Sequence, residues 1–164
     1  MFNPDEFLNA TFDQVIDTAR LPVPSGEYVA QVNTDDKAVS VDQGTIGKGE
    51  RAGQPWASLV VNMTIPDPSG AIKSQTGRDP VIVRHSVFLD LGPDGKMDFS
   101  AGKNIGFAKL FAAAGWPTDA KGKLTSGYSF SFLRGKTLKV RIENEPNPKD
   151  PSQMFERITA VTKA

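Results

Sequence analysis

Alternation of apolar and polar residues along the chain predicts a protein built mainly from β-strands. The alternation has the period of two that places one face of a strand in a core and the other in solvent. It is clearest from Val81 to Leu91, where every second residue is apolar except His85. The predicted strands are residues 27–33, 56–65, 81–91, 137–143 and 155–162.

One segment between the third and fourth predicted strands changes to the period of an amphipathic helix. Its apolar residues recur at i, i+3, i+4 and i+7, which places them on one helix face. They are Phe107, Leu110, Phe111 and Ala114. Asn104 or Ser100 is expected to cap the first turn, and Gly115, followed closely by a proline, is expected to end the helix.

The N-terminal residues 1–20 are expected to form an acidic arm or a short helix ahead of the folded domain. Asn3 can cap a helix whose first residue is Pro4, and two acids in the first turn suit the helix dipole. The sequence Leu-Pro-Val-Pro-Ser-Gly at 21–26 should end any preceding helix. A single domain is therefore expected over residues 21–164.

The predicted order of elements is β-β-β-α-β-β. Five strands with one helix between the third and fourth is the order of the OB-fold, a small Greek-key barrel that binds oligonucleotides and oligosaccharides. Its two binding loops would correspond to residues 34–55 and 145–153. Other small barrels and open α+β sheets have the same element count, so the order alone leaves them open.

Composition removes several kinds of chemistry. The 164 residues include no cysteine and one histidine, which excludes disulfides, thiolate zinc sites and CxxC redox motifs. We therefore expect neither a metal nor a cofactor. The first residues are acidic where a signal peptide is basic, and no apolar run approaches the ~18 residues of a membrane span. A soluble, cytoplasmic protein is expected.

Charge is balanced overall but unevenly distributed. Residues 1–50 contain nine acids and three bases, a net charge of −6, whereas residues 51–141 contain thirteen bases and six acids, a net charge of +7. A basic body with an acidic leading segment suits an anion-binding face, with the acidic segment as a partner-binding or autoinhibitory arm. An ordinary solvated surface would have the same composition.

Three segments resemble a family of short bacteriophage proteins, thought to be OB-fold single-stranded DNA-binding proteins of phage replication and recombination. The segments are Leu21–Tyr28, with Pro-Ser-Gly-Glu-Tyr leading into a strand, Phe107–Trp116, a helix that ends in Ala-Gly, and Leu133–Val140, with Leu-Arg-Gly-Lys before a strand. The resemblance extends over about residues 24–161. It implies a non-enzymatic protein in the cytoplasm of an infected host cell, with replication or recombination proteins as candidate partners.

Binding of single-stranded DNA requires basic side chains for the phosphates and aromatic rings on which bases stack. If strands two and three form a hairpin with Ile65 near Val81, Phe88 lies opposite Ser58 and diagonal to Trp56. Aromatic and basic side chains would then share the outward face of this strand pair, joined by bases from the fourth strand and the first long loop. The candidate binding residues are Trp56, Phe88, Arg84, Lys139, Arg141, Lys48 and Arg51.

Enzymatic sites are poorly represented in the sequence. His85 belongs to the apolar face of its strand, which favours a core histidine over a catalytic one. Gly102-Lys103-Asn104 resembles a phosphate-binding loop but lacks its serine or threonine. Asp90, Asp94 and Asp98 are spaced across a Gly-Pro turn, where aspartates ordinarily stabilise turns, so a two-metal site is not expected.

The sequence therefore predicts a non-catalytic OB-fold protein that binds single-stranded DNA without sequence preference. The alternative is a β-rich phage structural or adaptor protein in which Trp56 and Phe88 are buried in a subunit interface. Independently of function, the N-terminal segment could also cover the two rings. Large aromatic side chains that point outward usually have a partner, and this holds for both hypotheses. No membrane contact is expected, and oligomerisation is left open.

Overall fold

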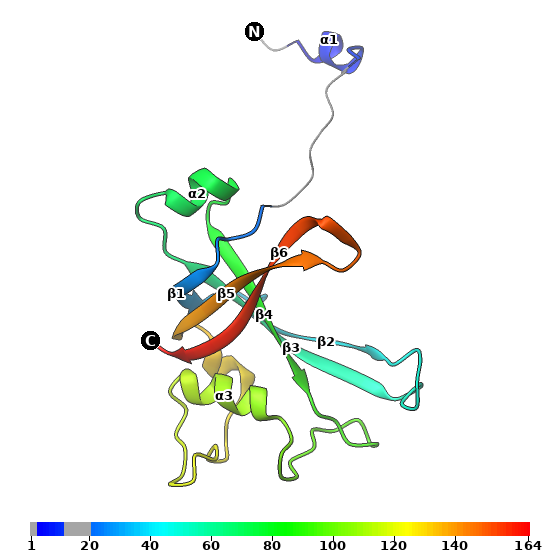
Figure 1. Ribbon diagram of the computed structural model, residues 1–164, viewed down its shortest axis with the longest axis vertical. Helices are drawn as coiled ribbons and strands as arrows, with labels where there is room; N and C mark the ends of the chain where they lie inside the picture. Colours follow the sequence, from blue (N-terminus) through cyan, green and yellow to red (C-terminus); the bar gives the residue numbers. More distant parts are fainter. Residues whose placement is uncertain (1–2, 12–20) are drawn as a thin grey trace.

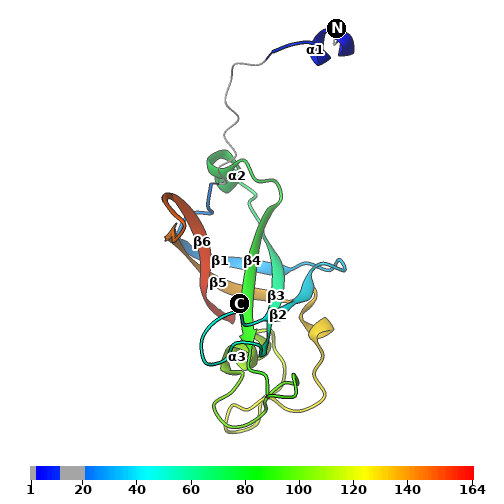
Figure 2. The same ribbon diagram turned by 90° about the vertical axis from the view of Figure 1, so that its right-hand side faces the viewer.

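The structure, a computed structural model, describes residues 3–11 and 21–164. Six antiparallel strands form one strongly curved sheet, with a helix at each of two opposite ends (Figures 1 and 2). The strands are β1 (Gly26–Val32), β2 (Val39–Thr45), β3 (Pro55–Ile65), β4 (Val81–Leu89), β5 (Thr137–Asn147) and β6 (Asp150–Lys163). The helices are α1 (Pro4–Leu8), α2 (Ala71–Thr76), α3 (Ile105–Ala113) and a 3-10 turn (Phe130–Leu133).

Strand β3 is the centre of the sheet. One edge of β3 pairs with β4, while the other edge pairs first with β2 and then, at Met63 and Thr64, with β1. Strand β1 continues the sheet to β5, and β5 pairs with β6. Within the described residues β4 and β6 do not pair with each other, so the sheet stays open between them.

The core lies inside the curve of the sheet, where the alternating strands place their apolar residues. The inward residues of β3 and β5 are fully or almost fully buried, as are the two phenylalanines of α3. They are Leu59, Val61, Met63, Leu138, Val140, Ile142, Phe107 and Phe111. Burying one such side chain stabilises the fold by roughly 1.5–3 kcal/mol, so the strict alternation in the sequence determines which face of each strand turns inward.

Helix α3 approaches β4 closely because Gly106 has no side chain. A Cβ at this position would lie 3.2 Å from Cγ1 of Val87, closer than ordinary van der Waals contact. Phe111 of the helix also packs against the rings of Trp116 and Phe132, at centroid distances of 6.5 and 6.2 Å. These contacts hold α3 at the open side of the sheet.

A buried ion pair holds the segment that precedes β1. Arg78 donates to both carboxylate oxygens of Glu156, at 2.6 and 2.8 Å, and also to the carbonyl of Leu21. Glu156 accepts a further bond from the backbone N–H of Val23, at 2.8 Å. These contacts fix the segment before β1 against β6 and the loop after α2.

The prediction of a mainly β fold with α3 is confirmed, but the prediction of five strands is wrong. Residues 39–45, expected in a long loop, form a sixth strand, and residues 71–76 form an additional helix. Strand β2 was missed because it is polar and mostly exposed on both faces, as expected where the β2–β3 hairpin projects away from the core (Figure 1). The loop expected at 145–153 is largely strand, since β5 and β6 continue to a tight hairpin.

The expected side-chain cap of α3 is also wrong. Asn104 precedes the helix in the left-handed region (φ 54°), and its side chain makes no capping bond. Instead it accepts from the backbone N–H of Asp90 and donates to the carbonyls of Asp90 and Asp98. The buried amide thus joins the end of β4 to the loop before α3.

The predicted N-terminal helix is confirmed at Pro4–Leu8, with Asn3 accepting the backbone N–H of Asp5 at 3.1 Å. Residues 1–2 and 12–20 of the predicted arm lie outside the described residues. In the part of the chain that the structure describes, no helix has the length and apolar character needed to cross a membrane.

Candidate nucleic-acid interface

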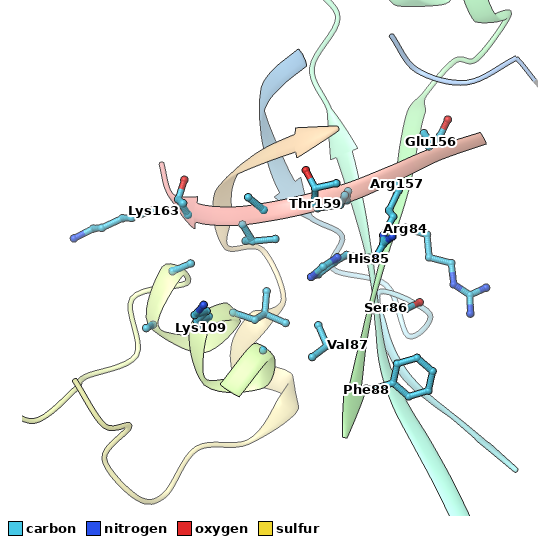
Figure 3. A pocket seen from close by; sticks show the side chains of 18 of the residues that line it. Arg84, His85, Ser86, Val87, Phe88, Lys109, Glu156, Arg157, Thr159 and Lys163 are labelled. Carbon is cyan, nitrogen blue, oxygen red and sulfur yellow. The ribbon is translucent and has the colours of Figure 1, made fainter. Parts of the chain in front are cut away.

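The predicted register between the two central strands is confirmed. Strands β3 and β4 pair antiparallel with Ile65 opposite Val81, Ser58 opposite Phe88 and Asn62 opposite Arg84. Arg84 and Phe88 therefore share one face of β4, the face that points away from the core. Figure 3 shows both side chains directed to the opposite side of β4 from His85 and Val87.

Trp56 and Phe88 form an aromatic pair on this outward face. Their ring centroids lie 6.3 Å apart with the planes tilted by 60°. Phe88 is 74% exposed, whereas Trp56 is half-buried because its indole lies against Gly44, its partner across the β2–β3 ladder. A Cβ at Gly44 would lie 2.7 Å from the indole Nε1, so only glycine leaves room for the ring in this position.

A cleft of about 530 Å³ opens beside the aromatic pair, at the end of β4. Its walls come from the β2–β3 hairpin, the aromatic pair and the residues after β4, and include Thr45, Arg51, Trp56, Phe88, Asp90 and Leu91. A cleft with exposed aromatic rings and a cation on its wall can accept a flat, partly apolar group that carries negative charge. A nucleotide has these properties.

The first long loop is an ordered hairpin tip rather than a free loop. Ile46 and Gln54 are joined across it by a backbone bond from the Ile46 N–H to the Gln54 carbonyl, at 2.9 Å. Arg51 donates from Nε to the side chain of Gln54, at 3.1 Å, while Lys48 stands exposed at the tip. Arg51 lines the cleft, whereas Lys48 lies nearer the tip of the same hairpin.

Arg84 has a partner that the sequence did not indicate. Its guanidinium forms an ion pair with Asp42 of β2, on the far side of β3. Arg84 lies opposite Asn62 and Asp42 opposite Ser58, so the pair spans Val60, which is 2% exposed although it points outward. The ion pair covers this valine and reduces the positive charge that Arg84 offers to an anion.

Lys139 and Arg141 lie elsewhere on the sheet. Both point outward from β5, which is separated from β3 by β1, and Arg141 pairs with Glu27 at 3.3 Å. Strand β1 touches β3 only at its far end, seven residues from Trp56, or roughly 23 Å at the rise of a strand. The structure therefore does not bring these two bases beside the aromatic pair.

The other polar candidates are His85, Asp90 and Asp98. His85 is half-buried on the core side of β4, and this burial lowers its pKa below the ordinary value. Asp90 accepts the backbone N–H of Asn104, at 2.6 Å, and Asp98 binds Ser100, so each carboxylate stabilises its own loop. Within residues 3–11 and 21–164, no group of three or more histidines and acids could hold a metal ion.

Sequence reasoning missed Gly44 and Asp42, which respectively seat the indole and hold Arg84. Both lie in β2, and the signal that could have found them is a weak alternation over residues 39–45, with valines at 39 and 41. The outward aromatic pair was found because it belongs to two strongly periodic strands.

In comparisons with known proteins, no protein-family model matches the chain, and no curated protein is significantly similar to it in sequence.

Proposed function

We propose that this protein binds single-stranded DNA without sequence preference and has no catalytic activity. Bases stack on Trp56 and Phe88, while Arg51 and Lys48 bind the phosphates on one side of the pair and Arg84 on the other. The observation that carries the proposal is the exposure of Phe88, 74%, next to a second aromatic ring and a cleft that contains a cation. Stacking of this kind contributes ~1–3 kcal/mol per base and tolerates every base.

The topology of the sheet supports an OB-fold. This fold is a five-stranded, partly open Greek-key barrel that binds oligonucleotides on the face of its second and third strands. The sheet of this protein matches that topology if β1 and β2, which follow one another along the same edge of β3, are counted as two halves of the first strand. Strands β3 and β4 then correspond to the binding face, and α3 lies between the third and fourth strands.

The resemblance to phage single-stranded DNA-binding proteins supports a role in phage DNA replication or recombination, in the cytoplasm of the infected cell. Proteins of those processes are then the expected partners. A protein of this kind acts by covering exposed single strands. It must therefore prefer them to duplex DNA and exchange quickly between sites.

The test is a fluorescence-anisotropy titration of a labelled oligo(dT) of about thirty nucleotides, several times the ~4–16 nucleotides that an OB-fold covers. Duplex competitor and two salt concentrations are included, because the release of counterions from phosphates makes binding salt-dependent. Wild-type protein should bind more weakly at the higher salt and should be displaced poorly by duplex.

Substitutions in the aromatic pair then locate the site. Phe88→Ala should weaken binding by roughly 5-fold to 150-fold, the equivalent of one lost stack. The matched control is Phe99→Ala, since Phe99 is also 74% exposed but does not line the cleft. Equal affinities for the two variants would remove the aromatic pair from the proposal, and no binding by wild-type protein at low salt would reject the function.

The second candidate is a phage structural or adaptor protein, and the same exposed Phe88 favours it. In that case the aromatic pair is buried against another subunit. Trp56 fluorescence separates the two candidates once the other tryptophan is removed by Trp116→Phe. Quenching by oligo(dT) supports DNA binding, whereas an emission shift that depends on protein concentration supports a subunit interface.

A further inference from the structure

A long groove runs along the open side of the sheet, between β4 and β6, with α3 at one end (Figure 3). Its volume is about 1480 Å³, nearly three times that of the aromatic cleft. His85 and Val87 point into it from β4, while Ile158 lines it from β6. In the described residues neither strand has a partner on this side, so the groove is bordered by two unpaired strand edges.

The charged residues that line the groove are mostly basic. They are Lys109, Arg157 and Lys163, with Glu156 as the only carboxylate among them, and Arg84, whose side chain points to the outward face of β4. Glu156 is neutralised by its bidentate pair with Arg78, while Arg157 lies 3.6 Å from Glu145. Lys109 and Lys163 are exposed and form no ion pair within the described residues. The groove therefore keeps a positive charge after its internal pairs are counted.

The groove and the aromatic cleft both border β4. Phe88 lines both hollows and Arg84 lines the groove, although the side chains of both residues lie on the outward face of β4. A DNA strand that leaves the aromatic pair would therefore pass round the edge of β4 to reach the groove.

The dimensions suit a single polynucleotide strand. The part of β6 that borders the groove runs from Phe155 to Lys163, which at the rise of a β-strand is roughly 26 Å. At the ~3.4 Å spacing of stacked nucleotides this length accepts up to about eight, and fewer when the strand is extended.

We propose that the groove between β4 and β6 is a second binding surface for single-stranded DNA, which holds the phosphates that lead away from the aromatic cleft. This inference rests on the proposed function. The cleft then anchors one part of the strand by stacking, and the groove extends the site through Lys109 and Lys163. Affinity should therefore continue to rise with oligonucleotide length after the cleft is filled.

The test compares wild-type protein with Lys109→Gln/Lys163→Gln on oligo(dT) of six and of thirty nucleotides. The matched control is Lys121→Gln/Lys123→Gln, which removes the same charge from an exposed loop that lines neither hollow. For the longer oligonucleotide, the groove variant should lower the slope of log affinity against log salt by about 1.4 relative to the control, or about 0.7 for each phosphate that the variant no longer binds. For the shorter one, the groove variant and the control should bind alike.

The possible results separate the two proposals. Equal salt slopes for the groove variant and the control, with wild-type protein binding both oligonucleotides, would overturn the groove and leave the proposed function standing. Failure of wild-type protein to bind either oligonucleotide would reject both. All four lysines are exposed, so thermal unfolding should show the variants folded as stably as wild type, within about 0.5 kcal/mol.

Discussion

The indole of Trp56 occupies the space that a side chain would need at Gly44, its partner in the β2–β3 ladder. Trp56 is therefore half-buried against β2, whereas Phe88, the other ring of the aromatic pair, projects into solvent. A glycine opposite an aromatic residue thus determines how the outward face of the hairpin is shaped.

Gly44→Ala should displace the indole, because the added methyl group would lie 2.7 Å from Nε1. In protein carrying Trp116→Phe, we expect a change in Trp56 emission and weaker oligo(dT) binding, with little change in stability at this partly exposed site. Gly47→Ala is the control, since a Cβ there meets nothing within 4 Å. Emission and affinity that stay equal in both variants would show that the indole does not depend on Gly44.

Asp42→Asn should strengthen binding of single-stranded DNA, because it releases Arg84 from its ion pair and removes a negative charge from the face. We expect the salt slope to steepen by about 0.7 if Arg84 then contacts a phosphate. Both partners are exposed, so stability should change by less than about 1 kcal/mol.

Two comparisons test that explanation. Asp36→Asn removes the same charge from an exposed residue that forms no ion pair in the described structure, and it should have a smaller effect. In protein that also carries Arg84→Gln, Asp42→Asn should no longer strengthen DNA binding. An equal gain with and without the arginine would mean that only the overall charge matters.

The free energy of unfolding should decrease as the pH falls below the pKa of a free histidine. Burial lowers the pKa of His85 in the folded protein, so the unfolded chain takes up the proton first, near its ordinary value of about 6.5. The stability that the neutral imidazole contributes is therefore fully present above about pH 6.5. It is lost as the pH falls from there toward the lowered pKa of His85 in the folded protein.

Denaturant unfolding at pH 7.5 and 5.5 measures this effect, with His85→Gln as the comparison. The variant should lose less stability than wild type between the two values. Because the chain contains one histidine, its NMR titration gives the folded pKa directly. A measured pKa at or above 6.5 would contradict the prediction.

Glu156→Gln should destabilise the fold strongly. The Arg78 and Glu156 side chains are only 10% and 16% exposed, and removing one charge leaves the other buried without compensation. We expect a loss of about 3 kcal/mol in the free energy of unfolding. Lys73→Gln, which breaks the exposed pair with Asp79, should change the free energy of unfolding far less, because solvent screens this pair. Similar losses in the two variants would show that burial does not strengthen this contact.

Deletion of residues 1–20 should raise the affinity for oligo(dT) if the acidic arm competes with DNA for the basic face. The deletion removes four carboxylates and one arginine. The gain should be largest at low salt, where charge repulsion is least screened. Unchanged affinity at low salt would show that the arm does not compete.

The sequence was informative where strands are half-buried. In β3 and β4 the alternation is strict because one face packs in the core, and the same pattern also determines the register that brings Phe88 near Trp56. The outward face could therefore be predicted residue by residue. The helix α3 was found for the same reason, through its periodic contacts with the core.

The sequence was uninformative where elements leave the core. Strand β2 carries Ser, Asp, Gln and Gly because little of it is buried, and such residues are also typical of loops. Without β2, neither the seat of Trp56 nor the partner of Arg84 could be derived. The placement of Lys139 and Arg141 depends on the curvature of the sheet between β3 and β5, which strand periodicity does not encode.

The unpaired edges of β4 and β6 also bear on how copies of this protein meet. An exposed edge invites pairing with another chain, and charged side chains such as those of Arg157 and Lys163 on β6 oppose it by repulsion between like edges. A polyanion bound along these edges would cancel the repulsion. If the protein binds DNA as proposed, molecules on one strand should then lie closer together than free molecules in solution, so that binding becomes cooperative without a dedicated dimer contact.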